Sequence, residues 1–538
     1  MKQHNLLLTV VSRLPSLVAM VALILLLSQE GRPAWSQQVV VVCPDQFESA
    51  AKHWIRHRRQ QGMSVARVIP KERARDTKRE VLLAFEELEK VHPTSVKPSS
   101  HHDHKQARRY LFLIGDTPTI GTVCDTSRSI PTFYLNSKVT LQWNSTPTIP
   151  TDFPYSDMDE DGIPEIAVGR LPVDRVSQFE NWLRRLWLRE ETNEFGDWFS
   201  EVQLVGGVGG FGFLADRAIE SVARTVVTGV LPTEVRTRVL YGSPGHRFFP
   251  NNATFTEAVV SDFSKGARFW VYAGHGQVTE LDRVPPKRDG IPVLDRRSIQ
   301  QLACRNQHAP IALLLACYTG ALDAAEDCIA EEMLFVNGGP IAAIAGSRVT
   351  MPYGNASLAV GLIQSIYTER HPRFGDNWLQ MQRSLGQETA SVEQSARVLI
   401  DGLATLLSPA GSTLAEERRE HVLLYQLLGD PTQSIRHAEK LVIDTAAGVD
   451  PGEPVSVALT SPLAGELVLR VDRPLGSITQ GDPNDTGLLR LVIPMKANQQ
   501  STATLKLPQG VTGPLVIRAQ VIAKNRIAVG ATKTIVRQ

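Results

Sequence analysis

Two short stretches of the sequence end in side chains that could act together as a nucleophile and its base. The run F-W-V-Y-A-G-H-G-Q (269–277) ends near His275, and the run I-A-L-L-L-A-C-Y-T-G (311–320) ends near Cys317. Apolar runs of this length are typical of parallel strands that are buried on both faces. Reacting groups gather beyond the carboxyl ends of such strands. Two neighbouring strands would therefore place an imidazole beside a thiol, which is how a cysteine nucleophile is paired with its base.

The glycines beside these two residues favour acyl transfer. A neighbouring imidazole keeps a thiol ionised, and the same ring can later protonate a leaving amine. The backbone N–H groups of Gly276 and Cys317 could point at one oxygen and form an oxyanion hole. A buried cysteine taken alone is more often structural. Both residues at strand ends, each with glycine nearby, favour the catalytic interpretation.

An acidic stretch, D-M-D-E-D-G-I-P-E (157–165), has the spacing of a calcium-binding loop. Carboxylates at alternate positions followed by a glycine can wrap oxygen ligands around the ion, here Asp157, Asp159, Asp161 and Glu165. The twelfth position is Val168, so the loop is not a complete EF-hand. We expect either a structural calcium site or an ordinary acidic turn, and no cofactor that the chemistry requires.

The glycine-rich stretch 206–212 follows a predicted strand and satisfies the spacing G-x-G-x-x-G through Gly207, Gly209 and Gly212. This spacing between a strand and a helix is typical of dinucleotide sites. Such sites also need an acidic residue after the next strand to hold a ribose, and the strand predicted at 234–240 ends in Tyr241 and Gly242. A loop that lets a substrate approach the backbone closely is therefore the favoured interpretation.

The first 36 residues predict export. Lys2 and Arg13 precede an apolar stretch (14–27), and Ala34-Trp35-Ser36 fits a cleavage site for a secretory signal peptide. An uncleaved membrane anchor is the alternative, and no later stretch has the apolar length of a membrane helix. We expect the protein to be secreted or held in the cell envelope.

The composition limits the classes of binding partner that we expect. The net charge is +1, so nothing favours binding to nucleic acid or to an acidic membrane surface. Five cysteines are too few for a disulfide framework, and the odd number leaves at least one thiol unpaired. Besides Cys317 these are Cys43, Cys124, Cys304 and Cys328. The sequence leaves the pairing of these four and the oligomeric state open.

The length of 538 residues predicts several domains. After the signal segment (1–36) we expect an N-terminal α/β subdomain (37–197), a catalytic subdomain (198–437) and an all-β domain (438–538). In the last of these, short strand-like segments separated by turn residues predict a sandwich. The segments are 454–459, 465–471, 488–493, 502–507, 514–522 and 527–536.

Motifs spread along the chain resemble those of the gingipain-type cysteine peptidases, within the caspase-like clan. They are V-V-V-V (39–42) with Gln61-Gly62, L-F-L-I-G-D (111–116), the segment 157–171, Y-A-G-H-G (272–276), A-C-Y-T-G (316–320), the segment 339–347 and L-L-G-D-P (427–431). The resemblance covers residues 38 to 437. It implies a caspase-like α/β region of two subdomains, a trailing immunoglobulin-like domain, and an exported cysteine endopeptidase acting on proteins or peptides.

The resemblance also implies roles for single residues. His275 would be the general base and Cys317 the nucleophile. The family places an acidic residue that orients the histidine in the loop matching 206–212, where this sequence has only Gly, Val and Phe. Either another carboxylate assists, with Glu280 and Asp282 as candidates, or the enzyme works as a dyad.

The resemblance implies cleavage after Arg or Lys. Asp216 is the best match to the aspartate that binds the basic side chain in the arginine-specific members, and Tyr353 lies near an aromatic residue that lines the same pocket. Two alternatives stay open. One is a processing or transpeptidase enzyme of an export system; the other, favoured by the missing acid, is an inactive surface or adhesion protein that keeps the fold.

Overall fold

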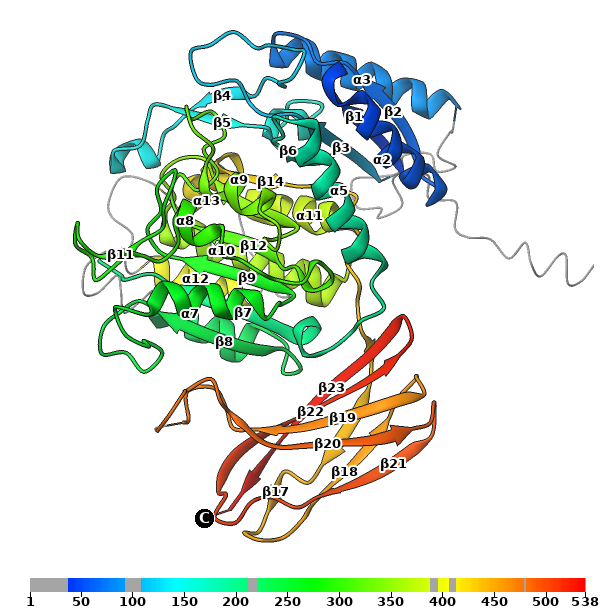
Figure 1. The fold of residues 1–538 in the computed structure, drawn as a ribbon, viewed down its shortest axis with the longest axis vertical. Helices are drawn as coiled ribbons and strands as arrows, with labels where there is room; N and C mark the ends of the chain where they lie inside the picture. Colours follow the sequence, from blue (N-terminus) through cyan, green and yellow to red (C-terminus); the bar gives the residue numbers. More distant parts are fainter. Residues whose placement is uncertain are drawn as a thin grey trace, which may run out of the picture.

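The computed structural model describes residues 37–91, 108–210, 220–221, 223–387, 395–405, 413–478 and 480–537. The expected signal segment (1–36) lies outside the described residues. Within the described part, no helix is long and apolar enough to span a membrane. The chain forms a large α/β region followed by a β domain at its C-terminal end (Figure 1).

Ten strands of the described chain form one central sheet, in the order β2-β1-β3-β6-β14-β13-β12-β9-β7-β8. Their bounds are β1 Gln38–Val42, β2 Ser64–Val68, β3 Arg109–Ile114, β6 Ala167–Leu171, β7 Glu201–Gly206, β8 Arg236–Tyr241, β9 Phe269–Ala273, β12 Ile311–Leu315, β13 Ala342–Gly346 and β14 Tyr425–Leu428. Neighbours are parallel except β13 and β14. Strands from residues 37–197 (β2, β1, β3 and β6) join strands from residues 198–437 in one sheet, where β14 pairs with β6 at Leu428 and Arg170. The predicted α/β class is confirmed.

The valines of β1 show why the apolar runs form central strands. Val39 and Val41 face one side, in a core that includes Trp54 of α2 (Glu48–Gln60), whereas Val40 and Val42 pack with the core of α3 (Ala74–Val91). A strand covered by helices on both faces must be apolar at every position. Further helices cover the sheet: α5 Val176–Glu191, α7 Phe255–Ser264, α8 Arg296–Ile299, α9 Ile329–Phe335 and α11 Phe374–Gly386.

After β13 the chain forms several helices: α10 Pro352–Gln364, a π-helix at Ser365–Glu369, α11, and α12 Ser395–Thr405. The sequence did not predict α13 (Leu414–Leu424). Glu417, Arg418, Glu420 and His421 are all buried in this helix, so it lacks the apolar stripe that marks most helices. The hairpin β4–β5 (Phe133–Asn136 and Thr148–Thr151) was missed too; its turn residues hid two short strands.

The C-terminal domain consists of two sheets around their own core. The larger has the order β15-β23-β22-β19-β20, with β17 on β23, and the smaller has the order β16-β18-β21. The six predicted strands are β18 Val455–Thr460, β19 Gly465–Asp472, β20 Gly487–Met495, β21 Gln500–Leu505, β22 Gly513–Ala523 and β23 Arg526–Val536. The short strands β15 Glu439–Lys440, β16 Val442–Thr445 and β17 Gly448–Val449 were not predicted.

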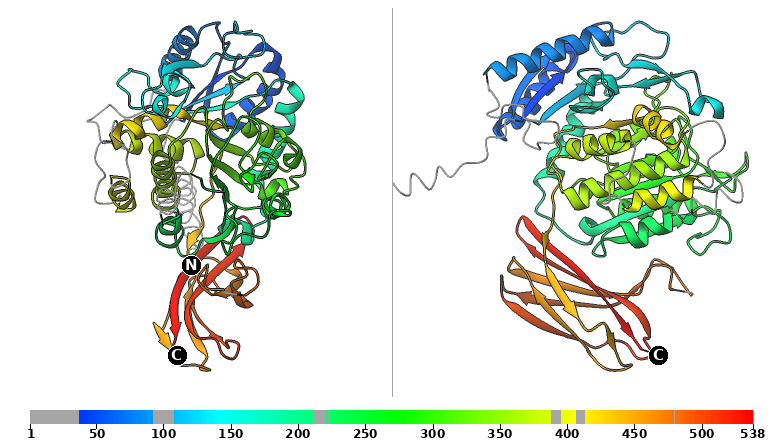
Figure 2. Two further views of the ribbon diagram at one scale, coloured as in Figure 1. Left: turned by 90° about the vertical axis from the view of Figure 1, so that its left-hand side faces the viewer. Right: turned by 180° about the vertical axis from the view of Figure 1, so that it is seen from behind.

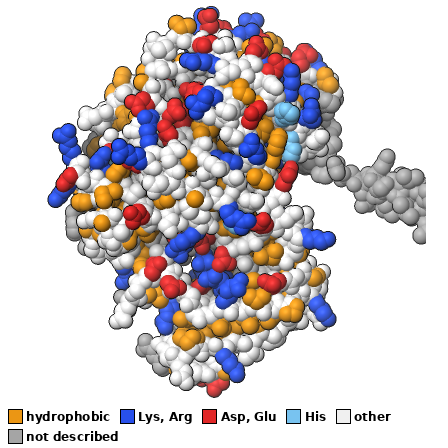
Figure 3. All heavy atoms as spheres, in the orientation of Figure 1, with side chains coloured by type: hydrophobic (Ala, Val, Ile, Leu, Met, Phe, Trp, Pro, Cys, Tyr) orange, Lys and Arg blue, Asp and Glu red, His pale blue; other side chains and the backbone are white. Residues whose placement is uncertain are grey.

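This domain docks against β8, the edge strand of the central sheet (Figure 2). The Asn484 side chain accepts a hydrogen bond from the Val239 backbone N–H (2.8 Å) and donates one to the Val239 carbonyl oxygen (2.9 Å). Asp197 bridges Arg236 of β8 and Arg470 of β19. Charged side chains of both signs gather where the two parts meet (Figure 3). The edge of the sheet is thus covered rather than left open for pairing.

Candidate active site

His275 and Cys317 follow two adjacent strands at the same distance. β9 and β12 are parallel neighbours, and Ala273 lies opposite Leu315 in their register. Each reactive residue is the second one after its member of this pair, and both side chains are partly exposed. The structure therefore brings the two predicted residues together at one edge of the sheet.

Gly276 lets the two turns approach each other. A Cβ at this position would lie 2.7 Å from the Cys317 carbonyl oxygen and 2.8 Å from Thr319 Cγ2, so any larger residue would push the turns apart. Among the described residues, no protein acceptor binds the N–H of Gly276 or of Cys317. Both donors are thus available to a ligand, as an oxyanion hole requires.

Helix α9 begins against both turns. The Ile329 N–H donates to the Val278 carbonyl (2.7 Å), and the Ala330 N–H donates to the Thr319 carbonyl (3.1 Å). The first turn is capped because Glu331 accepts a hydrogen bond from the Cys328 N–H (2.7 Å). Burial raises the pKa of Cys328, whose thiol is fully buried, so this cysteine has a structural place here.

Asp282 holds the His275 turn to the glycine-rich loop. Its Oδ2 accepts hydrogen bonds from the backbone N–H of His275 (3.1 Å) and of Val208 (3.1 Å), and from the Tyr272 hydroxyl (3.3 Å). Burial raises the pKa of Asp282, while the His275 N–H and the nearby imidazole charge act against this shift. Glu280, the other carboxylate considered, pairs instead with Arg283 (2.6 Å).

Gly207 makes room for that carboxylate. A Cβ on Gly207 would lie 2.0 Å from Asp282 Oδ2, which no real contact allows. The space that a side chain of the glycine-rich loop would enter is therefore occupied by the carboxylate of another loop. The described part of the glycine-rich loop also runs beside the imidazole, because a Cβ on Gly210 would lie 3.8 Å from His275 Nε2.

Thr350 lies on the other side of Cys317, and sequence reasoning missed it. Its backbone N–H donates to Cys317 Sγ at 3.3 Å. It follows β13, the parallel neighbour of β12, so three adjacent strands supply His275, Cys317 and Thr350 at the same edge. The apolar run that forms β13 was the available signal, since its end joins the same edge of the sheet.

Of the two residues expected to bind the substrate, Tyr353 is among the described residues and Asp216 is not. Tyr353 is half-buried in the first turn of α10; its hydroxyl donates to Asp401 (2.7 Å) and accepts a hydrogen bond from Arg418. Burial and the bond to Asp401 raise the pKa of Tyr353 to about 12, so the phenol stays neutral.

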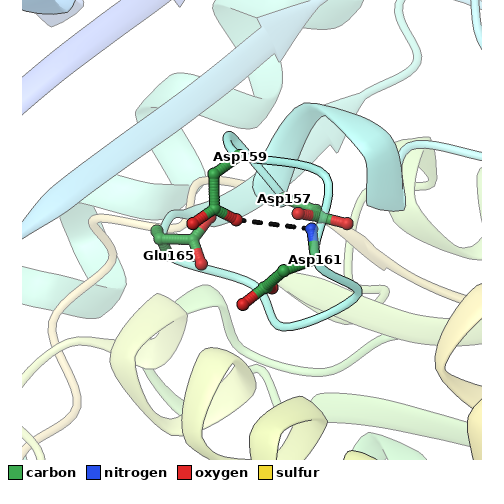
Figure 4. Close-up of side chains that lie close together, drawn as sticks. All are labelled: Asp157, Asp159, Asp161 and Glu165. Carbon is green, nitrogen blue, oxygen red and sulfur yellow. Dashed lines mark hydrogen bonds between the residues drawn. The ribbon is translucent and has the colours of Figure 1, made fainter. Parts of the chain in front are cut away.

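The acidic loop converges on one point (Figure 4). One oxygen each of Asp157, Asp159, Asp161 and Glu165 lies within 4.8 Å of the others. Burial, followed by the charges of the three aspartates, raises the pKa of Glu165 to about 7. Asp157 Oδ1 is buried with no hydrogen-bond partner among the described residues. These oxygens fit a hard cation such as calcium, which would relieve their repulsion.

Comparison with known proteins gives a family and a fold. The family model of Peptidase family C25 matches residues 33–436. The crystal structure of the Arg specific cysteine proteinase gingipain R (RgpB) superimposes with a TM-score of 0.51 at 15% identity, covering 94% of this chain and 99% of that chain. A structure described as a protease gives 0.53 at 13% identity, covering 94% and 98%.

A complex of the pro- and mature domains of RgpB from Porphyromonas gingivalis gives a TM-score of 0.49 at 16% identity, covering 93% of this chain and 100% of that chain. Among curated protein sequences, no relative matches the chain. At these identities the solved structures show a shared fold and no more.

Proposed function

The chain belongs to Peptidase family C25 and is therefore a cysteine peptidase, and from this premise we propose that it is an exported endopeptidase in which Cys317 is the nucleophile and His275 the general base. One observation carries the assignment. His275 and Cys317 stand at equal distances beyond the paired residues Ala273 and Leu315 of two adjacent parallel strands. Nucleophile and base on neighbouring strand ends are what acyl transfer requires.

The reaction would run through an acyl-enzyme. The Cys317 thiolate attacks the carbonyl carbon of the scissile bond, a C–S bond forms, and the carbonyl electrons move to oxygen. The protonated His275 gives its proton to the leaving amine as the C–N bond breaks. Water then attacks the thioester and gives a proton to His275. The C–S bond breaks, which releases the acid and restores the thiolate beside the imidazolium.

The negative oxygen of the tetrahedral intermediate would lie between the backbone N–H groups of Gly276 and Cys317. These donors are preorganised because Gly276 is packed against the Cys317 carbonyl. Removing one such donor typically costs about 3 kcal/mol of transition-state stabilisation. The glycine thus serves both the contact between the turns and the oxyanion hole.

Asp282 would act through the backbone of His275. Its carboxylate fixes the position of the turn that carries the imidazole, and its charge stabilises the imidazolium that forms during the reaction. The proposal is therefore a Cys–His dyad held by a buried carboxylate. The position of Asp282 argues against the inactive adhesion protein, since a carboxylate lies beside the histidine turn although the glycine-rich loop supplies none.

We further propose cleavage after Arg or Lys, with Asp216 binding the basic side chain and Tyr353 lining its pocket. Support comes from the sequence resemblance and from the structural match to gingipain R, which is an Arg specific cysteine proteinase. The acidic loop would bind a structural calcium ion through Asp157, Asp159, Asp161 and Glu165. The C-terminal β domain is proposed to be an immunoglobulin-like accessory module, and the N-terminal segment an export signal.

Peptide hydrolysis tests this function. Peptides that differ only in the residue before the scissile bond, with Arg, Lys, Ala or Glu, are incubated with the full chain and calcium. We expect kcat/KM to be highest for Arg or Lys, and Cys317→Ser to abolish turnover. Turnover of Ala or Glu peptides alone would contradict the proposed specificity. Cleavage that persists in the Cys317→Ser variant would contradict the proposed nucleophile.

A further inference from the structure

We propose that Thr350 stabilises the thiolate of Cys317 with two donors, its backbone N–H and its hydroxyl, and that Asn355 and Tyr425 aim the hydroxyl at the sulfur. The inference rests on the proposed function, because it concerns the same nucleophile. It adds a stabilising contact on the side of Cys317 that faces away from β9 and His275. None of these three residues was suggested by the sequence motifs.

The contacts between Thr350 and the sulfur are direct. The Thr350 N–H donates to Cys317 Sγ at 3.3 Å, and Thr350 Oγ1 lies 3.9 Å from the same sulfur. The neutral thiol also donates to the Thr350 carbonyl oxygen at 3.7 Å; this contact is lost when the thiol ionises, whereas the shorter contact from the N–H is kept. Hydrogen bonds to a charged acceptor are shorter and stronger than those to a neutral one. When the thiol loses its proton, both donors therefore gain strength, and the ionised form is favoured over the neutral form.

A chain of donors fixes the direction of the Thr350 hydroxyl. The Tyr425 hydroxyl donates to Asn355 Oδ1 at 2.8 Å, and Asn355 Nδ2 donates to Thr350 Oγ1 at 3.2 Å. Thr350 Oγ1 thus accepts a hydrogen bond from Asn355, and its own proton points to another acceptor. The acceptors within reach are the Cys317 sulfur, at 3.9 Å, and the Tyr425 hydroxyl oxygen. A thiolate is the stronger acceptor of the two because it is charged, so the Thr350 proton turns to Cys317 when the thiol ionises.

Burial makes this chain rigid. Thr350 is 6% exposed and Tyr425 is 2% exposed. Gly346 leaves the space that the threonine needs, because a Cβ there would lie 2.7 Å from Thr350 Cγ2. Burial raises the pKa of Tyr425, so its hydroxyl remains protonated and can donate to Asn355. A preorganised donor costs no rearrangement when the charge forms.

The test measures the reactivity of Cys317 rather than peptide cleavage. The rate of alkylation of the full chain by iodoacetamide is followed against pH, because the thiolate is the reactive form. Thr350→Val removes the hydroxyl and keeps the shape, so the midpoint of the profile should rise by roughly one pH unit. One unit below the wild-type midpoint, the rate should fall about tenfold. Thr350→Ser keeps the hydroxyl and should stay close to the wild type.

Further variants distinguish an effect of the hydrogen bonds between Tyr425, Asn355 and Thr350 from an effect of packing alone. Asn355→Ala should shift the midpoint in the same direction, and the Thr350→Val/Asn355→Ala double variant should shift it no further than Thr350→Val alone. The Cys317→Ser protein gives the background of the other four cysteines, all of which are buried. Thermal unfolding shows whether each variant folds. If Thr350→Val fails to fold, the Asn355→Ala profile decides.

Equal profiles for wild type, Thr350→Val and Thr350→Ser would overturn the inference, as would an unshifted Asn355→Ala profile. Failure of this inference and failure of the proposed function give different results. Shifted profiles in a protein that cleaves no peptide would contradict the peptidase proposal and leave the role of Thr350 standing. Peptide cleavage with unshifted profiles would contradict only the role of Thr350.

Discussion

Asp282 joins backbone segments that the proposed reaction needs in fixed positions. One oxygen binds the N–H of His275 at the end of β9 and the N–H of Val208 after β7, and Tyr272 donates to both Asp282 and the His275 carbonyl. Removing a group that orients a reactive residue commonly lowers the activity about 10- to 100-fold. In the proposed mechanism, the hydrogen bonds of Asp282 to these backbone N–H groups take the place of the acidic side chain that the glycine-rich loop lacks.

We predict that Asp282→Ala lowers kcat about 100-fold with little change in KM, because the substrate still binds while the imidazole loses its position. Steady-state kinetics on one peptide would measure both constants. Glu280→Ala is the matched control, since this carboxylate lies two residues away and pairs with Arg283. If both variants lose the same activity, Asp282 has no special role.

A substitution at Gly207 gives a second test of the position of the Asp282 carboxylate. Gly207→Ala should be strongly harmful in the wild-type chain, because the new methyl group would meet Asp282 Oδ2. In the Asp282→Ala background the same change should cost little more, since the carboxylate is gone. Additive losses of kcat in the double variant would show that the two positions do not share this space.

At the scale of the element, helix α9 links the turns that carry His275 and Cys317 to a pair of acidic residues, Asp116 and Glu331. Burial and the nearby Asp174 raise the pKa of Asp116, which follows β3, to about 7. Burial and the Asp116 charge raise the pKa of Glu331 in α9 well above its usual range. Asp327 also faces Glu331, and Arg170 faces Asp116. Two carboxyl groups with raised pKa values, one buried and one partly buried, hold a proton that the unfolded chain would release.

The pH dependence of stability follows from the sign of this shift. Because the folded pKa of Asp116 is raised, its contribution is fully present below its ordinary value of 3.8 and is lost as the pH rises through about 7. We therefore predict that Asp116→Asn gains stability relative to the wild type between pH 4 and pH 8, by on the order of 1–2 kcal/mol at the upper end. Urea unfolding at both pH values measures it. A difference that is the same at both would contradict the account.

The acidic loop before β6 makes a separate prediction. Calcium at about 100 times its dissociation constant should raise the free energy of unfolding by about 2.7 kcal/mol, and a chelator should remove the gain. Glu165→Gln should weaken this response. Glu160→Gln is the control, because Glu160 lies in the same loop but pairs with Lys78. An equal response in both variants, measured by thermal unfolding, would contradict the proposed ligands.

At the scale of the whole molecule, the C-terminal domain is held to the α/β region by contacts with an edge strand. Asn484 satisfies both backbone groups of Val239, and the Trp198–Phe199 cluster packs on Ala438 and Ile527. Bonds to an otherwise open strand edge protect it from pairing with other chains. The domain therefore stabilises the edge of the sheet at β8, whereas His275 and Cys317 follow β9 and β12.

We predict that Asn484→Ala speeds hydrogen exchange of the Val239 amide roughly fivefold and leaves kcat unchanged, because one hydrogen bond is worth about 1 kcal/mol. Asp485→Ala, the next position in the same loop, is the control. Equal exchange at Val239 in both variants would show that Asn484 does not hold this edge. A matching loss of kcat in Asn484→Ala would couple the domain to the active site.

Some features of the fold and the site could be predicted from the sequence and others could not, and the difference has physical causes. The strands that carry His275 and Cys317 were predictable because each is a continuous apolar run, a local signal. Thr350 and Tyr425 were not, since they reach Cys317 only through the pairing of β12, β13 and β14. Asp282 was one of two candidates until the structure showed which carboxylate contacts the histidine turn. Helix α13 was hidden by its buried charges.

The most direct test of the central claim is to locate the adduct of an arginyl or lysyl chloromethylketone on the full chain by mass spectrometry. The account predicts one adduct, on Cys317, whose formation is lost in His275→Ala because the thiol is then less ionised at neutral pH. Thermal unfolding of the variant shows that it is folded. An adduct on another cysteine, or labelling of Cys317 at the same rate without His275, would contradict the assignment of these two residues.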